Sequence, residues 1–129
     1  MILLDTHTWV WLADGSDRIS QEHVKKIQLH EKSGLGISAI SCWEVAKLVE
    51  HHRLKLACTI EEWMRAALAY PGIQLVEFSP RIAIESTQLP GTFHKDPADQ
   101  IIVATARVLG VELLTVDEKI LRYPHVQAA

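Results

Sequence analysis

Short apolar runs alternate along this chain with stretches that carry the caps and spacing of amphipathic helices. The apolar runs cover residues 1–4, 35–37, 73–78 and 111–116, and an edge strand could follow near Val126. Apolar runs of this length, bounded by turn residues, are typical of buried strands. Strands separated by helices pair in parallel, because a parallel connection needs a crossover. We therefore expect an α/β protein: a three-layer α/β/α sandwich with a central, mostly parallel sheet of four or five strands.

Capping residues define the expected helices. The clearest boundaries are Pro97 at a first helical position and Gly110 just past a helix end. The helix that begins near residue 40 could be capped by Ser38 or by Ser41. In the third apolar run, the alternation predicts that Leu75 faces the core. The other candidate N-caps are Ser20, Thr59, Ser79, Asp96 and Asp117.

The length and composition are those of one globular domain. The chain has 129 residues, of which 48% are apolar and 22% charged, so we expect a single domain over residues 1–129. No apolar stretch approaches the roughly 20 residues that a membrane helix needs. The N-terminus lacks the basic region of a signal peptide. We therefore expect a cytoplasmic protein with no membrane association.

Net charge gives a first indication about partners. The chain carries 16 acidic and 13 basic residues, a net charge of −3. An even spread of these charges would argue against a nucleic-acid binder. Several acids gathered around a bound cation would be neutralised, however. With four acids set aside in this way, the remaining charges balance to within one unit. The position of each acid therefore matters more than the total.

Four acids stand where the predicted topology gathers strand ends. Asp5 follows the first strand, Glu44 lies in the first turns after the second, and Asp117 follows the last. Asp99 lies in the first turn of the helix that begins near Pro97. Ligands of such sheets bind beyond the carboxyl ends of the strands. Clustered carboxylates stay ionised only around a cation, and oxygen ligands favour Mg²⁺ or Mn²⁺.

Two other interpretations of these acids stay open. Each could simply stabilise a helix N-terminus, an effect of about 0.3 to 1 kcal/mol. The chain would then be a non-enzymatic interaction module with tryptophans as its working surface. Alternatively, Asp5 could be the nucleophile of an aspartyl phosphatase or phosphotransferase. Against this, haloacid-dehalogenase-like phosphatases have a second Asp two residues later, where this chain has His7.

Four sequence segments, taken in chain order, resemble a known set of motifs. They read MILLDTH at 1–7, ISAISCWEV at 37–45, HKDPADQIIVATA at 94–106 and LLTVD at 113–117. Together they resemble the motifs of the PIN-domain ribonucleases, particularly the VapC-type toxins of toxin–antitoxin pairs. Each motif is loose by itself, but their joint spacing is specific and spans nearly the entire chain.

The resemblance implies a Mg²⁺- or Mn²⁺-dependent endoribonuclease with a PIN-like fold, commonly a homodimer. A small cognate antitoxin, whose tail lies over the active site, would hold it inactive. The catalytic and metal-binding acids of the family map onto Asp5, Glu44, Asp99 and Asp117. Asp96 is then a helix cap or a secondary ligand. The expected reaction is in-line attack on RNA by a metal-activated water, which Glu44 or Asp117 could orient or deprotonate.

Several neighbouring residues could support this site. The hydroxyls of Thr6, Thr115 and Ser38 could hold ligand carboxylates in place or could be ordinary turn caps. His94 and Lys95 precede the acidic helix start and could touch RNA phosphates or stay solvated. The same two possibilities apply to Lys47, Arg53, Arg107 and Arg122.

Overall fold

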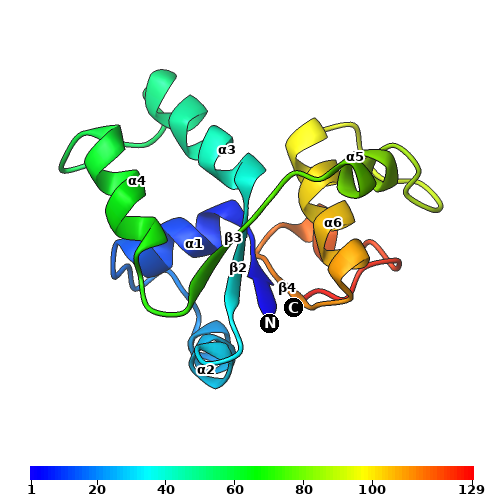
Figure 1. The fold of residues 1–129 in the computed structure, drawn as a ribbon, viewed down its shortest axis with the longest axis horizontal. Coiled ribbons are helices and arrows are strands. Elements are labelled where there is room, and N and C mark those ends of the chain that lie inside the picture. Colours follow the sequence, from blue (N-terminus) through cyan, green and yellow to red (C-terminus); the bar gives the residue numbers. More distant parts are fainter.

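A parallel sheet forms the centre of the fold. The computed structural model describes all 129 residues. Its four strands lie in the order β3-β2-β1-β4, and every pairing is parallel (Figure 1). The predicted α/β architecture is confirmed. The strands are β1 (Ile2–Leu4), β2 (Leu35–Ser38), β3 (Ile73–Val76) and β4 (Leu113–Leu114).

Seven helices cover this sheet in two groups, one on each face (Figure 1). The first group is α1 (Thr6–Ala13), α2 (Gln21–His30), α3 (Ala39–Glu50) and α4 (Ile60–Leu68). The second is α5 (Pro80–Ser86), α6 (Pro97–Leu109) and α7 (Glu118–Leu121). The result is the three-layer sandwich. No helix combines the length and apolar character needed to cross a membrane.

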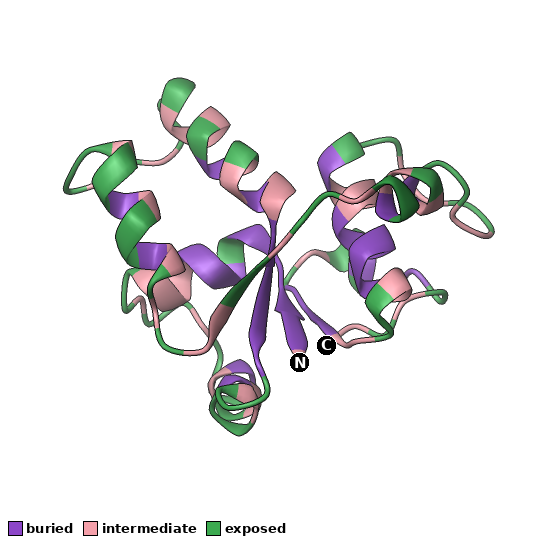
Figure 2. Ribbon diagram, in the orientation of Figure 1, coloured by how far each residue is buried: buried purple, intermediate pink, exposed green.

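The central strand β1 contributes to a core on each side of the sheet, because side chains of a strand alternate between its faces. Ile2 and Leu4 join the cluster beneath α1 to α4, whereas Leu3 joins the cluster beneath α6 and α7. Burial is accordingly concentrated along β1, β2 and β4 and on the inner helix faces (Figure 2). A strand buried on both faces has to be apolar throughout, as the first run of the sequence is.

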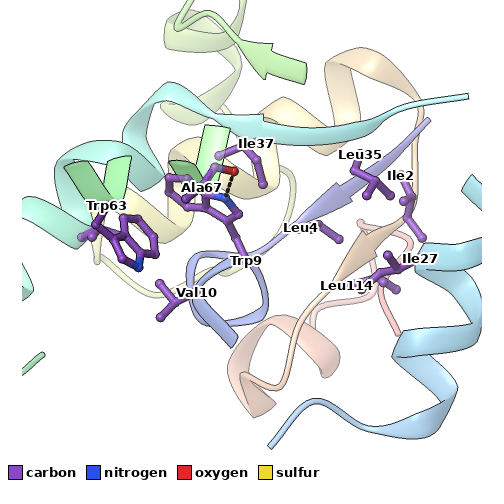
Figure 3. Close-up of a cluster of buried hydrophobic side chains, with 11 residues drawn as sticks. Ile2, Leu4, Trp9, Val10, Ile27, Leu35, Ile37, Trp63, Ala67 and Leu114 are labelled. Carbon is purple, nitrogen blue, oxygen red and sulfur yellow. Dashed lines mark hydrogen bonds between the residues drawn. The ribbon is translucent and has the colours of Figure 1, made fainter. Parts of the chain in front are cut away.

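Two tryptophans fill much of the first core cluster (Figure 3). The rings of Trp9 and Trp63 meet edge to face, with centroids 5.1 Å apart. The Trp9 indole is fully buried, and its Nε1 donates a hydrogen bond to the carbonyl oxygen of Ala67 at 3.3 Å. The contact joins α1 to α4 and leaves no polar atom of the ring unpaired.

Local details decide one alternative that the sequence left open, the cap of α3, and differ from the sequence-based expectations in two further places. Ser38 caps α3, accepting a hydrogen bond from the backbone N–H of Ile40, so the helix begins at Ala39, two residues before Ser41. Leu75 is 53% exposed, and the prediction that it faces the core was wrong, because β3 is the edge strand and is only partly covered. The expected edge strand near the C-terminus is a single parallel bridge between Leu113 and Ala128.

The two-sided burial of β1 predicts a large cost for shortening its side chains. Leu4→Ala should lower the free energy of unfolding by about 2 to 5 kcal/mol, because a cavity opens in a core that cannot fully collapse. Urea denaturation followed by circular dichroism measures this change. The matched control is Leu29→Ala on α2, where the side chain is 79% exposed and the change should be negligible. Equal effects at both positions would contradict the described packing.

Candidate active site

An acidic cleft opens at the carboxyl edge of the sheet, above the neighbouring strands β1 and β4. The chain leaves β1 for a helix on one face and reaches β4 from helices on the other, which is the kind of position where open α/β sheets bind ligands. The cleft has a volume of about 400 Å³. Its lining residues are Asp5, Thr6, His7, Trp11, Glu44, Asp96, Asp99, Val116 and Asp117. All four acids singled out in the sequence, together with Asp96, therefore face one space.

Asp5 is held more firmly than any other carboxylate of the cleft. It ends β1, caps α1 and is buried. Its Oδ1 accepts a hydrogen bond from the backbone N–H of Thr6 at 2.8 Å, and its Oδ2 accepts one from Thr115 Oγ1 at 2.6 Å. Burial raises the pKa of Asp5, and these two hydrogen bonds oppose the rise because they favour the ionised form. Both oxygens are thus fixed in orientation.

Glu44 is joined to the first strand end through Thr6. The Thr6 hydroxyl donates a hydrogen bond to Glu44 Oε1 at 2.6 Å and lies 2.9 Å from Ser41 Oγ. Burial raises the pKa of Glu44, the Thr6 hydrogen bond opposes this, and the charges of Asp5 and Asp96 add to the rise. One threonine therefore contacts the Asp5 carboxylate through its backbone and the Glu44 carboxylate through its side chain.

Asp96 and Asp99 have different roles at the start of α6. Asp96 is the N-cap, since its Oδ1 accepts hydrogen bonds from the backbone N–H groups of Ala98 at 3.0 Å and Asp99 at 3.3 Å. Asp99 Oδ2 lies 3.0 Å from Nε2 of His94. The alignment is too poor for a hydrogen bond and leaves this buried ring nitrogen unpaired. His94 thus stands directly against the acidic cleft.

Thr115 ties Asp117 to the same network. Asp117 caps α7, and its Oδ1 accepts a hydrogen bond from the backbone N–H of Lys119 at 2.8 Å. The backbone N–H of Asp117 donates to Thr115 Oγ1 at 3.0 Å, while that hydroxyl donates to Asp5. A single hydroxyl therefore fixes the relative positions of the two acids that follow β1 and β4.

The cleft accumulates negative charge that the protein does not neutralise. None of its five acids forms an ion pair with Lys or Arg. Burial is the largest cause that raises the pKa of Asp99 to about 7, followed by the charges of Asp96, Asp5, Asp117 and Glu44. Such a set of oxygen donors suits a hard divalent cation, whose charge would return every carboxylate to its ionised form.

The arrangement of the donors suits a partly hydrated ion. No three His, Cys, Asp or Glu side chains come together closely enough to hold a metal by themselves. Mg²⁺ commonly binds through one or two carboxylates and keeps several of its waters, because it loses them reluctantly. A cleft of about 400 Å³ has room for an ion with such a water shell. The residues present therefore fit Mg²⁺ or a cation of similar chemistry.

The supporting residues proposed from the sequence fall into two groups. Thr6 and Thr115 contact acidic side chains of the cleft, and His94 lies against Asp99. Ser38 acts as the α3 cap, and the exposed Lys95 is not part of the cleft lining.

Three polar or aromatic residues of the site were not predicted from the sequence. His7 and Trp11 line the cleft, and Ser41 contacts the Thr6 hydroxyl. Their spacing from the predicted site residues along the helices could have identified all three. His7 and Trp11 lie four residues apart on one face of the helix that Asp5 caps, and Ser41 precedes Glu44 by three residues on α3.

Sequence comparison places the chain in a known family. Residues 2–126 match the PIN domain family. The chain is 32% identical over 124 residues to ribonuclease VapC22 of Mycobacterium tuberculosis, a match that covers 96% of this chain and 92% of the relative. The chain therefore belongs to the PIN domain family, and within it to the VapC ribonucleases. This class is the one that the sequence motifs predict, and it excludes the phosphatase and the non-enzymatic module.

Solved structures share the fold. The crystal structure of VapBC2 from Rickettsia felis, bound to a DNA fragment from its promoter, matches with a TM-score of 0.70 and 19% identity, covering 100% of this chain and 98% of that chain. VapC20 of Mycobacterium tuberculosis, a Sarcin-Ricin loop cleaving toxin, matches with a TM-score of 0.60 and 14% identity, covering 98% of this chain and 99% of that one. Both likenesses establish the sandwich topology.

The raised pKa of Asp99 predicts how stability depends on pH without metal. The folded protein holds a proton on Asp99 up to about pH 7, whereas an unperturbed Asp loses it near 3.8. The stabilisation that comes from this bound proton is therefore fully present at low pH and is lost as the pH rises from about 4 through 7. In chelator at pH 8, Asp99→Asn should raise the free energy of unfolding by about 1 to 2 kcal/mol, because it removes a repelled charge. A variant less stable than the parent at pH 8 would contradict this electrostatic account.

Proposed function

We propose that this VapC ribonuclease is a Mg²⁺- or Mn²⁺-dependent endoribonuclease and the toxin of a type II toxin–antitoxin pair. The proposal extends over residues 1–129 as a single nuclease domain. Its main support is the acidic cleft at the ends of β1 and β4, where five carboxylates have no basic ion-pair partner except His94. A cluster of this kind costs stability unless a cation binds, so its most direct explanation is a metal site.

Asp5, Glu44, Asp99 and Asp117 are the residues that we expect to hold the metal, some directly and the others through its bound waters. A divalent cation bound among them would supply a nucleophilic water at neutral pH and would neutralise charge on the scissile phosphate. Asp96 uses Oδ1 for the α6 cap, which leaves its Oδ2 for a secondary role toward a metal-bound water. This assignment needs no nucleophile from the protein itself.

The remaining chemistry belongs to side chains that orient water and move its proton. Glu44 is anchored through Oε1 by Thr6, and its Oε2 is available to accept a proton from the attacking water. Asp117 is anchored through Oδ1 in the same manner and could serve equally well. Thr115 keeps Asp5 and Asp117 at a fixed separation, which preserves the geometry for in-line attack.

The partners that we propose follow from the family. Several related structures are named as toxin–antitoxin complexes, among them VapBC from Salmonella typhimurium and a complex from Klebsiella pneumoniae. We propose by analogy that a small antitoxin covers the acidic cleft and keeps this chain inactive, and that the chain forms a homodimer. RNA is the proposed substrate, and the cytoplasm is the proposed location. Mapping RNA ends after brief expression would identify the target.

Removing one metal-binding carboxylate tests the proposed chemistry. Asp5→Asn and Asp99→Asn should each abolish cleavage of RNA in Mn²⁺ or Mg²⁺, because the cation loses a ligand, while circular dichroism shows a retained fold. The matched control is Asp17→Asn, an exposed acid outside the cleft, which should cleave like the parent. Full activity of either cleft variant, or parent activity that survives a chelator, would reject the assignment.

Thr115 provides a second test, directed at positioning. Thr115→Val keeps the shape but removes the hydrogen bond to Asp5, and it should lower metal affinity or activity by about 10- to 100-fold. Thr115→Ser restores the hydroxyl and should recover most of the loss. Manganese titration monitored by electron paramagnetic resonance separates a loss of affinity from a loss of fold. If the valine variant bound manganese as tightly as the serine variant, the hydroxyl would have no such role.

A further inference from the structure

A second hollow adjoins the acidic cleft along helix α3. Its volume of about 520 Å³ exceeds that of the cleft. It is lined by Trp43, Glu44, Lys47, Leu48, His51 and Arg53, and we call it the α3 pocket. Glu44 lines both spaces, so the α3 pocket lies directly beside the cleft on the other side of this side chain. Anything that extends from the cleft past Glu44 would therefore enter the α3 pocket.

The charge of the α3 pocket differs from that of the cleft. Lys47 and Arg53 bring two positive charges and His51 a third titratable nitrogen, against the single carboxylate of Glu44. A cleft lined by five acids repels the phosphates that flank a scissile bond, even when one divalent cation is bound. A polyanionic substrate consequently needs cationic contacts close by, and these side chains supply them on the α3 side.

Trp43 adds a flat aromatic surface to the same pocket. Its side chain is 53% exposed, whereas Trp9 and Trp63 are core residues and Trp11 lines the acidic cleft. The Lys47 ammonium lies 5.8 Å from the Trp43 ring centroid. An exposed aromatic ring beside a flexible cation is the combination with which proteins hold single-stranded nucleic acid, because every base offers a face for stacking.

The spacing along α3 matches a substrate that passes outward from the reaction centre. Glu44, Lys47 and His51 are separated by three and four residues, so they share one face of the helix. At about 1.5 Å of rise per residue, Lys47 stands roughly 4.5 Å and His51 roughly 10 Å beyond Glu44 along the axis. A strand whose scissile phosphate lies near Glu44 would thus meet Lys47 with its neighbouring nucleotide.

We propose that the α3 pocket binds a nucleotide of single-stranded RNA next to the scissile phosphate, with its base stacked on Trp43 and its phosphate held by Lys47 and Arg53. This inference rests on the proposed ribonuclease function and adds the substrate-binding surface to it. Unpaired bases are required for such stacking, so the pocket selects single-stranded or looped RNA over a regular duplex.

Glu50 competes with RNA phosphates for the Lys47 ammonium. Its Oε1 lies 2.9 Å from Lys47 Nζ and 3.4 Å from His51 Nε2. The Lys47 and Glu50 side chains are 44% and 59% exposed, and exposed pairs of this kind contribute little to stability. Lys47 can therefore exchange Glu50 for a phosphate. Glu50→Gln removes the competitor, and RNA should then bind several-fold more tightly.

RNA binding in the cleavage-deficient Asp5→Asn protein tests the proposal. The probe is a short fluorescein-labelled oligouridylate, followed by fluorescence anisotropy in Mg²⁺. Adding Trp43→Leu or Lys47→Ala should each weaken binding about tenfold, and Lys47→Ala should also reduce the slope of log affinity against log salt by about 0.7. The charge-matched control is Lys25→Ala on α2, an exposed lysine outside every described pocket, which should bind like the parent.

An abasic probe distinguishes stacking from general attraction. Removing the base at the position nearest the cleavage site should weaken RNA binding to the Asp5→Asn protein. It should not change RNA binding to the protein that also carries Trp43→Leu. If Trp43→Leu and Lys47→Ala bind RNA like the Lys25→Ala control, the proposal is overturned. A pocket that serves a protein partner instead would give that result together with weaker binding of a co-expressed antitoxin. Failure of the ribonuclease function itself would look different, because the protein without any substitution would then cleave no RNA in Mg²⁺ or Mn²⁺.

Discussion

Repulsion between carboxylates at the ends of β1 and β4 is the constraint that organises this molecule. Five acids line a cleft of about 400 Å³ with no Lys or Arg ion-paired to any of them. Burial and mutual repulsion raise the pKa of Asp99 to about 7. A fold tolerates such an arrangement only when the rest of the structure holds the acids in place. A divalent cation bound among them would relieve this energetic cost.

The scaffold holds the acids in place through β1 and two threonines. β1 lies between β2 and β4, is buried on both faces and ends at Asp5, so the position of this acid is fixed by the core itself. Hydrogen bonds from Thr6 position Glu44 relative to Asp5, and hydrogen bonds of Thr115 position Asp117 in the same way. Residues far apart in the chain thereby become one network at the edge of the sheet. Stability of the core and geometry of the site are consequently coupled.

Sequence patterns predicted the architecture well because they reflect local physics. The acids Asp96 and Asp117 could be recognised as helix caps from their own segments, and each caps the helix that follows it. Alternation of strands and helices then required a parallel sheet, whose carboxyl ends collect those caps.

Features that depend on tertiary contact were not predictable in this way. The exposure of Leu75 follows from the place of β3 at the sheet edge, which no local pattern specifies. The contact of His94 with Asp99 and the partnership of Ser41 with Thr6 depend on side-chain orientation across elements. The α3 pocket likewise arises from a helix face that looks like an ordinary amphipathic surface in the sequence. Its charge and its exposed tryptophan become meaningful only beside the acidic cleft.

The central claim is that a divalent cation binds among Asp5, Glu44, Asp99 and Asp117 in the acidic cleft. Crystals grown with Mn²⁺ and measured near the manganese absorption edge would test it most directly. The account predicts an anomalous peak inside the cleft, bonded to Asp5 and to at least one further acid, with water completing its coordination. A well-diffracting crystal with no peak there, or with manganese bound only elsewhere on the surface, would contradict it.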